Sequence, residues 1–298
     1  NTSGYVAPNY GYDGLKYNKA KDNFDRSKRP ASGVSPVVKV PAVWKKELDN
    51  GVKIIGTKNS ETPTVTLVFN LKKGGFLNTT PEKAGVASLL GSLMNESTQN
   101  YTAEQMAAEL EKLGSSVSVS ADDEGLSFSV QTLKKNLDKT LKLFEERLYK
   151  PKFDAAEFER IKKQSIQGLR VQQTQPTFIA SDIFGKLLHG NKEIRAISES
   201  GTVETLEKVT LDDVKALYEL GQITPQTLEG NLIIVGDITE AEILPKLSFL
   251  GKVGKNKAIT PIITDKAGLR TEYKPETINS IEKTRIYLID KPKSAQSE

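Results

Sequence analysis

The chain has 298 residues, 37% of them hydrophobic and 27% charged, with a formal net charge of +4 at pH 7. This is the balance of a soluble globular protein, and no apolar run is long enough to span a bilayer. The lack of cysteine excludes thiolate metal sites and thiol catalysis, and the basic residues are interspersed with acidic ones rather than gathered as on a nucleic-acid-binding face.

Residues 1–40 are expected to form a linker or an extended arm. Tyrosines alternate there with Gly, Asn and Asp, and no helical or strand period holds; they are Tyr5, Tyr10, Tyr12 and Tyr17. The arm is either a strap across a neighbouring lobe or a partly ordered tether. Because the chain begins without Met or a signal-peptide pattern, we expect it to be an internal or processed piece.

Strands are predicted from Trp44 onward. Residues 44–48 and 52–55 form the two arms of a hairpin around Asn50-Gly51, since Asn-Gly is a strong hairpin signal. Residues 64–71 alternate between apolar and polar side chains and predict a third strand.

Two helices and two strands are expected next. One helix runs from Pro81 to Met94, and a capping box at Thr102 begins the other. Residues 115–121 and 125–132 alternate and predict the two strands, with an acidic turn between them.

The rest of the domain is predicted to be mostly helical, apart from a buried strand at residues 232–236 with a continuous apolar run. Pro176 is expected to end the longest helix. The predicted helices span residues 137–148, 154–175, 178–188, 210–218 and 239–250.

Strands and helices therefore come in runs, which predicts an α+β domain over residues 41–255. We expect a mixed or antiparallel sheet of about six strands, covered by helices on one side. Residues 256–298 are predicted to be a connector and the start of a second, incomplete lobe, with a strand at residues 284–289.

The sequence contains one histidine, His189, which is placed at a helix end before Gly190. A catalytic zinc normally takes three protein ligands, most often including two or three imidazoles. The chain therefore cannot build a histidine-based zinc site or catalytic triad of its own, and His189 is interpreted as a residue of a helix C-terminus.

Small residues gather on one face of the helix at 81–94, where Ser88, Gly91 and Ser92 would let another backbone approach closely. The same stretch resembles the His-x-x-Glu-His helix of the inverzincin metallopeptidases, the insulinase, pitrilysin and processing-peptidase family. The resemblance puts the two histidine positions at Ser88 and Ser92 and the glutamate position at Gly91. Serine is a poor zinc ligand and glycine cannot accept a proton, so these positions form a degenerate motif.

The resemblance extends from Trp44 to Gly251. In the family a long helix supplies a third ligand, a glutamate, and here Gln167 or Gly168 stands at that position. Residues 22–27 resemble the segment that opens the second half of bacterial tandem members. The other matching segments are 48–52, 101–104, 113–114, 149–153, 157–160, 205–214 and 232–238.

The resemblance implies the non-catalytic half of a zinc endopeptidase, with no catalytic residue and no cofactor in this chain. A partner half, on the same or a separate chain, would carry zinc, and the two would close as a clamshell around extended, unfolded peptides held by strand addition. It favours a bacterial periplasmic or secreted setting. Two alternatives stay open: a scaffold subunit of the same fold without protease activity, and a stand-alone peptide-binding module.

Overall fold

The computed structural model describes residues 41–252 except Asn191 and Gln222, together with a few isolated positions before residue 41. The chain divides into two units, residues 1–40 and 41–298. The isolated positions are Asn9, Gly11, Gly14, Lys16, Asp25, Ser27, Lys28 and Gly33. The expected tyrosine arm and the expected strand at 284–289 lie outside the described residues.

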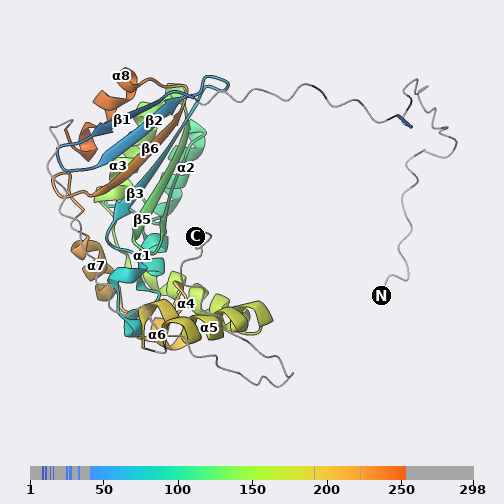
Figure 1. Cartoon of the computed structure of the whole chain (residues 1–298), viewed down its shortest axis with the longest axis vertical. Helices are drawn as coiled ribbons and strands as arrows, with labels where there is room; N and C mark the ends of the chain where they lie inside the picture. The colour runs from blue at the N-terminus through green and yellow to red at the C-terminus, as the bar shows by residue number, and fades with distance from the viewer. Residues whose placement is uncertain are drawn as a thin grey trace. The chain divides into compact units, whose positions relative to one another are not determined.

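A six-stranded mixed sheet forms the centre of the domain, with strand order β1-β2-β6-β3-β5-β4 (Figure 1). β2 and β6 are parallel, and every other neighbouring pair is antiparallel. The strands are β1 (Val43–Glu47), β2 (Lys53–Lys58), β3 (Thr64–Lys72), β4 (Ser116–Ala121), β5 (Gly125–Leu133) and β6 (Gly230–Gly236). The predicted α+β class is confirmed.

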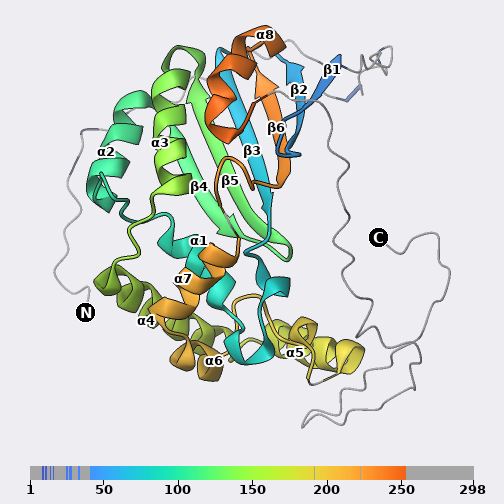
Figure 2. The same ribbon diagram turned by 90° about the vertical axis from the view of Figure 1, so that its left-hand side faces the viewer.

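The helices lie mainly beside and below the sheet, with α2 and α3 against one of its faces (Figures 1 and 2). They are α1 (Val86–Leu93), α2 (Ala103–Leu113), α3 (Leu137–Tyr149), α4 (Ala155–Gln172), α5 (Pro176–His189), α6 (Val203–Lys208), α7 (Leu211–Leu220) and α8 (Glu240–Ile243). None of the described helices has the length and apolarity needed to cross a membrane.

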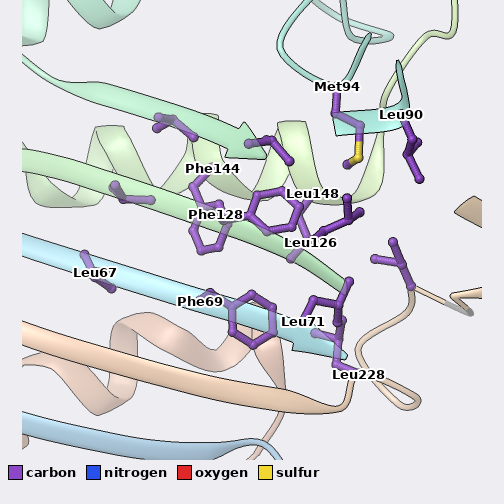
Figure 3. Packing of buried hydrophobic residues seen from close by; sticks show 14 of the residues in the cluster. Leu67, Phe69, Leu71, Leu90, Met94, Leu126, Phe128, Phe144, Leu148 and Leu228 are labelled. Carbon is purple, nitrogen blue, oxygen red and sulfur yellow. The ribbon is translucent and has the colours of Figure 1, made fainter. Parts of the chain in front are cut away.

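The core lies between the sheet and α3. Phe69 of β3, Phe128 of β5 and Phe144 of α3 are fully buried, and their ring centroids lie 5.6 to 6.4 Å apart (Figure 3). Apolar residues at every second strand position point to this side, so the alternation in the sequence sets which face of each strand is buried.

The other face of the sheet is more exposed to solvent than the continuous apolar run in β6 predicted. Leu232 and Ile234 are fully buried, but Ile233 and Val235 are 41% and 40% exposed. Ile55 of the neighbouring β2 pairs with Ile233 and is 39% exposed. The expectation of a fully buried strand was wrong, because an apolar run does not reveal that helices cover only one face.

Two predicted helix boundaries were also wrong. The helix expected from Pro81 is a 3-10 turn, Pro81–Lys83, and α1 begins only at Val86, because Gly85 adopts a left-handed conformation with φ +94°. A β-carbon at Gly85 would lie 2.5 Å from the Leu206 side chain. Pro176 does not end α4 but begins α5, since proline at the first helical position loses no hydrogen bond.

Candidate functional site

Ser88, at one of the histidine positions of the motif, faces helix α4. It lines a hollow of about 180 Å³ whose other polar side chains are Ser165, Gln172 and Ser200. α1 and α4 thus meet where the resemblance would place a metal.

The donors around this hollow do not suit zinc. Ser88, Ser165 and Ser200 offer neutral hydroxyls and Gln172 offers an amide, whereas zinc in proteins takes thiolate, imidazole or carboxylate ligands. Within the described residues, no three His, Cys, Asp or Glu side chains are grouped so that they could hold a metal ion. The residues that line this hollow therefore do not provide a zinc donor set.

The two candidates for the third ligand position differ in where they lie. Gly168 lines the same hollow as Ser88, and a β-carbon there would meet nothing within 4 Å. Gln167 is exposed and is not part of that lining. Gly168 is thus the position from which a longer side chain could approach Ser88.

Gly91, at the glutamate position, lies against the sheet. A β-carbon there would lie 2.7 Å from the backbone nitrogen of Ala121, at the end of β4. The close backbone contact predicted for the small residues is thus present at Gly91, whereas Ser88 lines the hollow and Ser92 is exposed. The space that a glutamate side chain would need at position 91 is occupied by the strand.

His189 is the last residue of α5, followed by Gly190 with φ +83°, as the sequence predicted. It lines a separate hollow of about 500 Å³ with Phe178, Asp182 and Arg195. Asp182 is paired with Lys186 on its own helix at 2.6 Å. His189 therefore lies at a hollow with both apolar and polar lining residues, and it is not among the residues that line the hollow of Ser88.

A second feature beside the motif was not predictable from the sequence. Asn95, directly after α1, hydrogen-bonds the backbone of Val119 in β4, and Arg147 of α3 reaches the same strand. Neither residue belongs to a recognisable motif, and their partners are distant in sequence.

The fold and the site thus define an α+β domain in which helices cover one face of the sheet and the hollow between α1 and α4 has no zinc-binding side chains. The model of the family described as Insulinase (Peptidase family M16) matches residues 53–196. Over residues 53–196 this match confirms the resemblance read from the sequence.

The chain is similar to a curated protein, the non-peptidase homolog YmxG of Helicobacter pylori (strain ATCC 700392 / 26695). The two are 24% identical over 221 residues, which cover 72% of this chain and 49% of the relative. The chain thus spans about half the length of this relative.

Solved structures share the fold. The peptidase M16 inactive domain from Pseudomonas fluorescens aligns with a TM-score of 0.62 and 24% identity, over 72% of this chain and 52% of that chain. The periplasmic protease PqqL from Escherichia coli aligns with a TM-score of 0.62 and 18% identity, over 82% of this chain and 26% of that chain.

Proposed function

We propose that the chain is the non-catalytic half of a zinc-dependent endopeptidase, forming one wall of a chamber in which a partner half binds zinc and hydrolyses peptides. One observation carries the proposal. The hollow between α1 and α4 lies where the resemblance leads us to expect a metal, and its polar side chains offer only hydroxyls and an amide. This lobe would shape the chamber and leave water activation to the partner.

The relatives support this assignment. One is named a non-peptidase homolog, another an inactive domain of an M16 peptidase, and a third is a periplasmic protease of which this chain spans 26%. A non-catalytic lobe fits the first two names, and a catalytic neighbour fits the periplasmic protease. The setting proposed for the chain, a bacterial periplasm, rests on the same protease.

The proposal is tested by metal content and by reconstitution. Purified chain incubated with zinc and then desalted should retain far less than one equivalent, and alone it should not hydrolyse an unfolded peptide. The neighbouring coding sequence should supply a half with His-x-x-Glu-His, and adding this chain should raise its kcat/KM for peptides by at least about tenfold. Tight stoichiometric zinc in the isolated chain would refute the proposal.

A scaffold without protease activity is the second candidate, favoured by the name of the non-peptidase relative. Reconstitution separates the two. If a zinc-bearing half binds this chain but its kcat/KM is unchanged, or if no such half is encoded nearby, the scaffold is the better assignment.

A further inference from the structure

β4 is an edge strand, because it pairs with β5 on one side and with no strand on the other in the described part of the chain. An edge strand presents unpaired backbone groups to which an extended polypeptide can add. In an antiparallel pair, alternate residues direct their N–H and C=O groups away from the partner strand. On β4 the groups that point outward include those of Val117 and Val119.

The side chain of Asn95 forms hydrogen bonds with the outward-pointing backbone N–H and C=O groups of Val119. Its side-chain oxygen accepts a hydrogen bond from the Val119 N–H at 2.9 Å, and its side-chain nitrogen donates to the Val119 carbonyl at 2.7 Å. The same nitrogen also donates to the Gly91 carbonyl at 2.8 Å. A carboxamide carries the same donor and acceptor as a peptide group, so Asn95 takes the place of one residue of an added strand.

Arg147 forms a hydrogen bond with the next outward-pointing backbone group, the carbonyl of Val117. Its side chain is only 6% exposed, and its guanidinium donates to the Val117 carbonyl and, at 2.8 Å, to the backbone carbonyl of Asn95. No salt bridge of the described residues includes Arg147. Its guanidinium also donates to the side-chain oxygen of Asn95 at 3.5 Å, and these donors hold the strand edge and the end of α1 together.

The contact between Gly91 and the backbone of Ala121 covers the remaining part of the outer side of β4. Because this residue has no β-carbon, α1 lies close to the backbone of Ala121, one outward position beyond Val119. The outer side of β4 is thus covered from Val117 to Ala121 by α1 and by two side chains, and no strand takes part.

We propose that Asn95 and Arg147 form an edge plug, an intramolecular substitute for a peptide strand that closes β4 to extended polypeptide backbones. The site beneath the plug is a strand-addition site that accepts backbone irrespective of sequence once Asn95 is removed. The inference rests on the proposed function at one point only. If the chain holds peptides within a chamber, then the peptides bind at surfaces other than the edge of β4.

The test uses NMR of the full chain with reduced, carboxymethylated α-lactalbumin as an unfolded probe. In the wild type, the amide signals of Val117, Val119 and Ala121 should not move when the probe is added. In Asn95→Ala, which removes both the hydrogen bonds and the volume of the carboxamide, they should shift saturably. The control Asn70→Ala removes a carboxamide from β3, away from β4, and should behave as the wild type.

Two results would overturn the inference. One is probe-induced shifts of these amides in the wild type, and the other is a folded Asn95→Ala variant that does not respond to the probe. If Asn95→Ala does not fold, hydrogen exchange of the wild-type chain tests the inference instead. The Val119 amide should then exchange within about tenfold of the internal Phe128 amide, and exchange at the rate of an unprotected amide would refute the plug. Zinc content and reconstitution do not enter this test, so the two proposals can fail separately.

Discussion

Lys83 donates a hydrogen bond to Asp213, with 2.7 Å between its Nζ and the carboxylate Oδ2. Asp213 also accepts hydrogen bonds from the backbone and hydroxyl of Thr210, the residue that caps α7. The pair joins the turn before α1 to the first turn of α7. Burial acts to raise the pKa of Asp213, but the hydrogen bonds from Lys83 and Thr210 outweigh it and lower that pKa below its ordinary value of 3.8.

Replacing Asp213 with Asn should therefore destabilise the domain by about 0.5–1 kcal/mol near neutral pH, through the weakened cap and the lost ion pair. A lowered folded-state pKa contributes stability above the unfolded pKa, and this contribution is lost as pH falls through the folded value. Urea unfolding should show a wild-type advantage near pH 7 that shrinks as pH falls below the ordinary pKa of 3.8 and through the lowered folded-state pKa. Asp212→Asn is the control, because that side chain is 93% exposed, and it should change little at either pH.

Gly91→Ala should destabilise the fold, since its β-carbon would lie 2.7 Å from the backbone of β4. We expect a net loss of about 1–2 kcal/mol, with strain exceeding the gain in helix propensity. Gly168→Ala is the matched control, as it too lies in a helix but has open space around it. It should stabilise the domain by about 0.5–1 kcal/mol. Thermal unfolding measures both, and equal effects of the two changes would contradict the contact at position 91.

Restoring ligands should restore metal binding without catalysis. In the triple variant Ser88→His, Ser92→His and Gly168→Glu, two imidazoles one helical turn apart and a carboxylate from α4 offer a zinc donor set. The variant should retain about one zinc after desalting but should not hydrolyse peptides, because no base stands at Gly91.

The comparison variant also has three changes, Ser88→His, Ser92→His and Gln167→Glu. Its carboxylate therefore stands at position 167 instead of position 168. Its zinc affinity should be at least about tenfold lower, since Gln167 lies outside the hollow that Ser88 lines. Equal affinities of the two variants would mean that the ligand position has been assigned to the wrong residue.

Adjacent isoleucines of β6 should differ in their sensitivity to truncation. Ile234 is fully buried, so Ile234→Ala should lower the free energy of unfolding by about 2–5 kcal/mol. Ile233 is 41% exposed on the open face, and Ile233→Ala should lower it by only about 1 kcal/mol. Denaturant titration of both variants checks this, and similar losses would mean that the second face is also covered.

Features that depend on neighbouring residues were predictable from the sequence. The turn at Gly51, the capping box of Thr102 and the left-handed Gly114 that ends α2 each follow from a few adjacent residues, and each is present. The alternation in β3 and β5 likewise predicted which side chains enter the core, because strand geometry fixes a period of two.

What the sequence could not reveal depends on contacts between distant segments. The exposure of Val235 depends on which sheet face the helices cover, and apolar character alone does not encode that. Asn95 and Val119 are 24 positions apart, and a lone asparagine after a helix has no local signature of strand pairing. In the same way, only the packing of α1 on α4 distinguishes Gly168 from Gln167 as the neighbour of Ser88.

The contact between Gly91 and Ala121 imposes an order on any return to catalysis. Position 168 has open space around it, so a carboxylate can be accepted there in a single step without rearrangement. Position 91 accepts a glutamate only after the edge strand has moved away from the helix. A general base at position 91 therefore requires movement of the strand, and no single substitution in the motif helix is enough to introduce one.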